Sequence, residues 1–104
     1  MTELARLPLD KVADGTAVHL DGGPHGICVV RIADDYYAVS DRCSHANVAL
    51  SAGDVDPLEC TIECWKHGST FSLRDGHPQS LPAIQPVTVY QVERDGDDLV
   101  VVAP

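Results

Sequence analysis

Two short stretches decide the fold of this chain: Cys43-Ser44-His45 and Cys64-Trp65-Lys66-His67-Gly68. The first is a Cys-x-His pair and the second is a Cys-x-x-His pair. The short gap inside each pair lets a thiolate and an imidazole converge on one bound group, while residues 46–63 separate the pairs into two facing loops. Two cysteines and two histidines suit either zinc or a mixed-ligand iron–sulfur cluster. The spacing therefore predicts a metal site and leaves the metal open.

The segment around the two pairs, about residues 41–83, is rich in glycine and proline. We interpret it as a loop-rich insertion that depends for its order on something other than a large apolar core. Cys60-Thr61-Ile62 is a short strand candidate that leads into the second pair, and Gly68 permits a tight turn after it. The breakers in this segment are Gly53, Gly68, Gly76, Pro57, Pro78 and Pro82.

Strand-like runs separated by turn residues flank this insertion on both sides. Before it come residues 16–20 and 26–33, followed by a hairpin across Asp34-Asp35 into Tyr36 to Val39; after it, residues 87–92 and 99–102 flank a second hairpin at 94–98. A short helical turn near residues 8–13 is the one helical signal. We expect one all-β domain over residues 1–104, made of antiparallel sheets with the insertion as an inserted tip.

Composition narrows the function classes. The chain has 104 residues and a formal net charge of −9. Such acidity argues against nucleic acid and against anionic membrane surfaces as partners. No apolar run approaches the roughly 20 residues of a membrane span, and the N-terminus has no signal-peptide pattern. We expect a soluble cytoplasmic protein, in which thiols stay reduced; Cys28 and Cys60 are then core residues, and His19, His25 and His77 are surface residues.

A wider pattern resembles the cluster-binding signature of the Rieske family. It joins the two Cys/His pairs to the segments Gly53-Asp54-Val55 and Ser69-Thr70-Phe71 and to Gly76 and Pro82. The resemblance implies a Rieske-like antiparallel β-sandwich or barrel with a loop-rich cluster-binding subdomain. It also implies one [2Fe–2S] cluster per chain, with one iron bound by two cysteines and the other by two histidines. Carried over residue by residue, the ligands are Cys43, His45, Cys64 and His67.

Departures from the family pattern indicate a low reduction potential. Respiratory Rieske proteins have a disulfide between the two loops, where this chain has Val48 and Lys66, and a tyrosine where this chain has Phe71. Donors near the sulfurs stabilise added negative charge, so losing one lowers the potential. We therefore expect a midpoint near the bottom of the roughly −150 to +300 mV range of Rieske centres. Trp65 is either a docking surface or loop packing, and the pattern does not decide.

Three functions remain open. The first is an electron carrier, not itself an enzyme, that passes electrons from a flavoprotein reductase to a non-heme iron oxygenase. The second is an accessory redox protein of iron–sulfur cluster assembly, or the small subunit of a reductase such as nitrite reductase. The third is a zinc-stabilised interaction module without a redox role.

Overall fold

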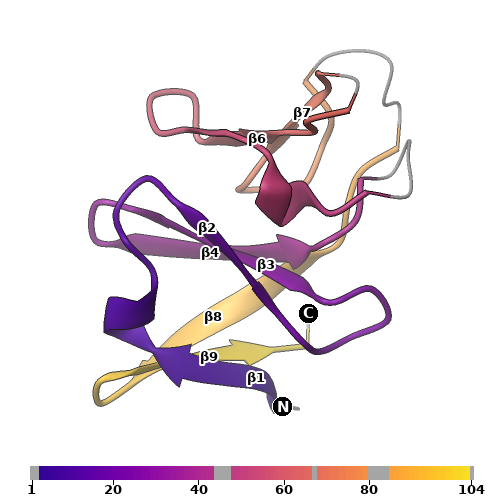
Figure 1. Cartoon of the computed structure of the whole chain (residues 1–104). Helices are drawn as coiled ribbons and strands as arrows, with labels where there is room; N and C mark the ends of the chain where they lie inside the picture. Colours follow the sequence, from indigo (N-terminus) through magenta and orange to yellow (C-terminus); the bar gives the residue numbers. More distant parts are fainter. Residues whose placement is uncertain (1–2, 44–47, 67, 80–84, 104) are drawn as a thin grey trace.

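The computed structural model describes residues 3–43, 48–66, 68–79 and 85–103, and these form two antiparallel sheets (Figure 1). A six-stranded sheet in the order β1-β9-β8-β4-β3-β2 forms the base, and a three-stranded sheet in the order β5-β6-β7 lies above it. The strands are β1 (Glu3–Pro8), β2 (Ala17–Leu20), β3 (Ile27–Ile32), β4 (Asp35–Ser40), β5 (Val55–Asp56), β6 (Thr61–Glu63), β7 (Thr70–Ser72), β8 (Val89–Asp95) and β9 (Asp98–Val102). Two 3₁₀ turns, η1 (Leu9–Lys11) and η2 (Leu50–Ala52), complete the described elements. The predicted all-β class is confirmed.

The hairpins of the base follow the sequence signals closely. The turn between β3 and β4 lies at residues 33–34, one residue earlier than the predicted Asp34-Asp35. Ala33 adopts a positive φ of 55° there, and its backbone N–H donates to the Asp14 carboxylate at 2.7 Å. This long-range bond fixes a conformation that an alanine rarely adopts, which is why local turn chemistry pointed to the wrong pair of residues.

The chain ends of the base lie next to each other. The predicted C-terminal hairpin is present as β8 and β9, joined across Gly96. Strand β1, for which no separate strand had been predicted, pairs with β9 from Glu3 to Pro8. The predicted helical turn near residues 8–13 is η1. Base strands thus come from both ends of the chain, with the small sheet inserted between them (Figure 1).

Strand β3 is buried on both faces, because each face supports a separate core. Ile27 and Val29 point into the core that β1, β8 and β9 enclose. Cys28 and Val30 point the other way, into the core shared with the small sheet. Successive side chains of a strand alternate between faces, so a continuously apolar strand is the expected sequence for this position.

The small-sheet region, residues 48–79, comes after β4 in the chain. Its strands have only two or three residues each, and it packs on the base through Leu50, Ile62, Phe71 and Leu73, each at most 1 % exposed. Its apolar face is therefore shared with the base. Among the residues that the structure describes, no helix is long and apolar enough to cross a membrane.

Candidate metal centre

The first thiol of the predicted site lies just beyond β4. Cys43 is only 2 % exposed, and its backbone N–H donates to the carbonyl of Val48 at 3.0 Å. This bond joins the two sides of the segment that leaves the base and reaches η2. His45, the partner of Cys43 in the sequence pattern, lies outside the described residues.

The second thiol lies just beyond β6, in a turn closed by two backbone hydrogen bonds. Cys64 is fully buried; its N–H donates to the Ser69 carbonyl at 2.7 Å, and its carbonyl accepts from Gly68 N–H at 2.9 Å. Gly68 has a φ of 76°, the left-handed conformation that glycine adopts without strain. The predicted tight turn after the second pair is confirmed. His67 lies outside the described residues.

The two thiols belong to one buried cluster. Cys43 and Cys64 lie in the core that the base shares with the small sheet, here called the upper core, together with Leu50, Ile62 and Phe71. All four cysteines of the chain are thiols rather than disulfides. A thiolate in such apolar surroundings is costly unless a cation compensates its charge. Two thiol-bearing turns that border one apolar core are therefore compatible with an iron centre that has sulfur ligands.

Gly53 lets η2 approach the strand that leads to Cys64. A Cβ atom at Gly53 would lie only 1.7 Å from the Glu63 carbonyl oxygen. The glycine of the quoted Gly53-Asp54-Val55 segment is thus required by close backbone contact. The backbone carbonyl of its neighbour Asp54 accepts a hydrogen bond from the Glu63 N–H at 2.8 Å, and this bond sets the register of β6 against β5.

The remaining cysteines are core residues, as predicted. Cys28 is fully buried, and its burial, with a smaller effect from the Asp41 charge, raises the pKa of its thiol strongly. Cys60 is 3 % exposed and adopts a positive φ of 56°. A hydrogen bond from the Tyr37 hydroxyl to the Cys60 sulfur, together with burial, raises the pKa of Tyr37. The Cys28 and Cys60 side chains are therefore both packed inside the protein.

The surface next to Cys64 is formed by an aromatic and a basic side chain. Trp65 is 56 % exposed and Lys66 is also exposed. For Trp65, this exposure disfavours the interpretation as packing between the two loops. Ser69, which belongs to the quoted segment Ser69-Thr70-Phe71, is fully buried.

One polar group next to the site had no signal in the sequence. The Asp41 carboxylate contacts His19 and Ser51, which lie 22 and 10 residues away along the chain. His19 had been assigned to the surface, and half of its side chain is indeed exposed. Because strand pairing brings these residues together, no local spacing rule could have found them. His25 and His77 are exposed, as predicted.

Comparison with known proteins identifies the family. The family model for the Rieske [2Fe-2S] domain matches residues 4–102. The chain belongs to the Rieske [2Fe-2S] family. It is 34 % identical, over all of its own length and 96 % of theirs, to proteins named 3-phenylpropionate/cinnamic acid dioxygenase ferredoxin subunit from Shigella boydii serotype 4 and Escherichia coli strain K12.

Solved structures agree with this Rieske assignment. The ferredoxin of carbazole 1,9a-dioxygenase from Nocardioides aromaticivorans IC177 superposes with a TM-score of 0.93 at 34 % identity, with both chains covered completely. A protein described as a putative nitrite reductase small subunit superposes with a TM-score of 0.83 at 19 % identity, which shows the shared fold alone. The metal left open by the spacing is thus decided: the Rieske domain carries one [2Fe–2S] cluster of the Rieske type.

Proposed function

We propose that this Rieske protein is a ferredoxin whose cluster is bound by Cys43, His45, Cys64 and His67. The observation that carries the ligand assignment is the burial of Cys43 and Cys64 in one core, at the ends of two turns closed by backbone hydrogen bonds. The histidines follow from the family pattern and from their place beside these cysteines. On this basis the cluster-binding subdomain is about residues 41–83 of a single domain, 1–104.

When bound, the cluster takes up and releases one electron. The chain's own residues shape the surroundings of that exchange. The apolar side chains of the upper core surround the buried Cys43 and Cys64 and exclude water from them. Trp65 and Lys66 lie exposed on the turn that Gly68 closes, where a protein partner can reach them.

The partners we propose are a flavoprotein reductase as electron donor and a non-heme iron oxygenase as acceptor. Relatives covering nearly the same length are named as ferredoxin subunits of dioxygenases. A structure described as a complex of reduced oxygenase and oxidized ferredoxin in carbazole 1,9a-dioxygenase superposes with a TM-score of 0.85 at 29 % identity. We further propose that the protein acts in the cytoplasm and that catalysis resides in its partners.

The test is an electron paramagnetic resonance spectrum of the dithionite-reduced protein, with iron, sulfide and zinc measured on the same sample. We expect a Rieske-type signal from two irons per chain, and a midpoint in the lower part of the roughly −150 to +300 mV range. Each of the substitutions Cys43→Ser, His45→Ser, Cys64→Ser and His67→Ser should abolish that signal. An unchanged signal in any of the four would contradict the ligand assignment.

A second measurement tests the carrier role itself. The reduced holoprotein, mixed in a stopped-flow instrument with an oxidised Rieske oxygenase such as that of carbazole 1,9a-dioxygenase, should be reoxidised in a bimolecular step. Because the protein is acidic, we expect the rate to depend on ionic strength. Trp65→Ala should slow this step without changing the midpoint potential. A slow, concentration-independent reoxidation would argue against the proposed acceptor class.

A further inference from the structure

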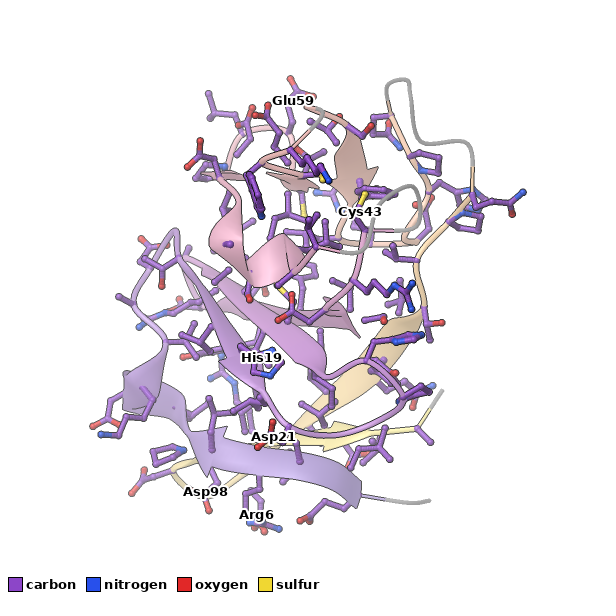
Figure 2. The ribbon with its side chains drawn as sticks, turned by 45° about the vertical axis from the view of Figure 1, so that its right-hand side comes forward. Arg6, His19, Asp21, Cys43, Glu59 and Asp98 are labelled. Atoms are coloured by element: carbon purple, nitrogen blue, oxygen red, sulfur yellow. The ribbon has the colours of Figure 1, made fainter. Side chains whose placement is uncertain are left out.

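A buried carboxylate lies where the base meets the small-sheet region. The Asp41 side chain is fully buried, just after β4 and two residues before Cys43. Its Oδ1 accepts a hydrogen bond from the Ser51 backbone N–H at 2.7 Å. Its Oδ2 accepts from the Ser51 hydroxyl at 2.6 Å and lies 2.5 Å from Nδ1 of His19. In Figure 2, His19 lies on the base between Asp21 and Cys43.

These contacts close the segment of chain that carries Cys43. The segment begins at Asp41, and Ser51 follows its last residue. The two hydrogen bonds that Ser51 donates to the Asp41 carboxylate therefore join the two ends of the segment. The Asp41 backbone N–H also donates to the Gly26 carbonyl of the base at 3.1 Å. The side chain and backbone of Asp41 thus hold the start of the segment on the base and join it to η2. Holding both ends reduces the conformations open to the segment between them.

The same carboxylate places a charge beside the thiol core. A buried carboxylate is costly without a cationic partner, and His19 is that partner. The hydrogen bond to Asp41 is the main cause that raises the pKa of His19, so the pair favours an imidazolium. The Asp41 charge also adds to burial in raising the pKa of Cys28, which shares the upper core with Cys43. The charged pair thus lies at the edge of the core that contains Cys43, and its Asp41 comes two residues before that cysteine in the chain.

We propose that Asp41 is a positioning residue for the cluster: with Ser51 it closes the segment that carries Cys43, and with His19 it sets a local charge balance that acts on the reduction potential. This inference rests on the proposed role of Cys43 as a ligand. The titratable groups that face His19 are Asp41 from the end of β4, Asp21 from the turn after β2, at 3.5 Å from Nε2, and Cys28, its pair on β3.

The closing role is tested by the rate at which holoprotein variants lose iron to a chelator. Asp41→Ala removes all three side-chain contacts and should release iron at least about tenfold faster than the unmodified protein. Asp41→Asn can keep the closure, because its amide oxygen accepts from Ser51 N–H and its amide nitrogen donates to the Ser51 hydroxyl. We expect its release rate to stay within about threefold of the original. Unchanged release in Asp41→Ala would overturn the closing role.

Ser51→Ala provides a second test if Asp41→Ala does not fold. It deletes the hydroxyl bond and leaves the backbone bond, so we expect release several-fold faster than in the unmodified protein. Release at the original rate in Ser51→Ala would also count against closure. The Cys43→Ser variant separates the two claims: if it keeps its cluster, the ligand assignment fails, whereas if it loses the cluster while the Asp41 and Ser51 variants behave normally, only this inference fails.

The charge role is tested by reduction potentials between about pH 6 and 9. Asp41→Asn removes a negative charge and should raise the potential most clearly at the two ends of this pH range. Near neutral pH its effect should be smaller, because losing Asp41 also lowers the pKa of His19 and so removes the opposing positive charge. His19→Gln keeps a hydrogen-bond donor but removes the positive charge, so it should lower the potential at acidic pH. As the pH rises through the raised pKa of His19, the potential of His19→Gln should approach that of the unmodified protein.

Asp21→Asn is the matched control, because it removes the same charge from a fully exposed carboxylate facing the same histidine. Its shift should be clearly smaller than that of Asp41→Asn, since solvent screens exposed charges. If the network acted only through structure, Asp41→Asn and His19→Gln would not be expected to shift the reduction potential in opposite directions. Shifts of the same sign, or an Asp21→Asn shift as large as that of Asp41→Asn, would overturn the charge role.

Discussion

The base and the small-sheet region are both antiparallel sheets, but they are stabilised differently. Most base strands have five or six residues, and they enclose a core of aliphatic side chains and Tyr90. The small sheet has strands of two or three residues, and the core beneath it contains four cysteines. Short strands with little apolar surface rarely hold together alone. The difference indicates that the base folds on apolar burial, whereas the small sheet depends on the base and on the cluster.

The contacts between the two regions support this contrast. In the part of the chain that the structure describes, the two sheets share no strand. They meet through side chains and through η2, which packs on β2 and β3. Binding a metal only in the folded state adds its binding free energy to the stability of the region that holds it. Loss of the cluster should therefore affect one region far more than the other.

Removing the cluster should give the largest effect. In Cys64→Ser, or after chelation of the native protein, backbone amides of β6 and β7 should lose most of their protection from hydrogen exchange. Amides of β3, β4 and β9 should keep their protection, because the core that the base strands enclose, here called the lower core, stays intact. Hydrogen exchange followed by mass spectrometry measures both regions at once. Equal loss of protection in the base would show that the two regions unfold as one unit.

Truncating a core side chain in each region sharpens the comparison. Leu99 and Leu50 are both at most 1 % exposed, in the lower and the upper core respectively. Leu99→Ala should lower the free energy of unfolding of the base by about 2–5 kcal/mol, because it leaves a cavity. Leu50→Ala should mainly accelerate iron loss. Denaturation followed by circular dichroism, with iron release measured in parallel, tests this division, and identical effects of both substitutions would contradict it.

Gly53→Ala should disturb the small-sheet region alone. Its backbone has φ −93° and ψ −176°, which any residue adopts, so the added methyl acts only through its clash with the Glu63 carbonyl. The backbone must shift, and we expect a cost of about 1–3 kcal/mol. The measurement is the exchange of the β6 amides in the holoprotein. As a comparison, Gly96→Ala in the base turn meets no atom within 4 Å, and its cost comes from a positive φ instead.

The smallest effect should come from pH, through His19 between the regions. Its pKa in the folded protein is raised above the ordinary 6.5, chiefly by the bond to Asp41. The contribution to stability is then fully present below about pH 6.5 and is lost as pH rises through the raised pKa. The stability difference between the unmodified protein and His19→Gln should shrink from about pH 6 to pH 9. A stability difference that grows with pH would contradict this prediction. Because half of the His19 side chain is exposed, we expect the effect on stability to be modest.

Much of this architecture was accessible from local patterns. The turns at Gly96 and Gly68 and the apolar run from Ile27 to Val30 each have a physical signature that a reader of the chain can recognise. Strand β1 was not separately predicted, because its pairing with β9 joins the two ends of the chain and leaves no local trace. The turn at Ala33 was displaced by one residue because the distant Asp14 carboxylate stabilises it.

The sequence by itself supplied the two Cys/His pairs and the resemblance to the Rieske signature, since residue identity and short spacing are local properties of the chain. It also indicated that Cys28 belongs to the core. Only the tertiary structure decided that Cys43 and Cys64 share one apolar enclosure and that Asp41 joins His19 to Ser51. Such neighbours are brought together by strand pairing and by the packing of one sheet on another. Their contact energies depend on residues far apart in the chain, so no local spacing encodes them.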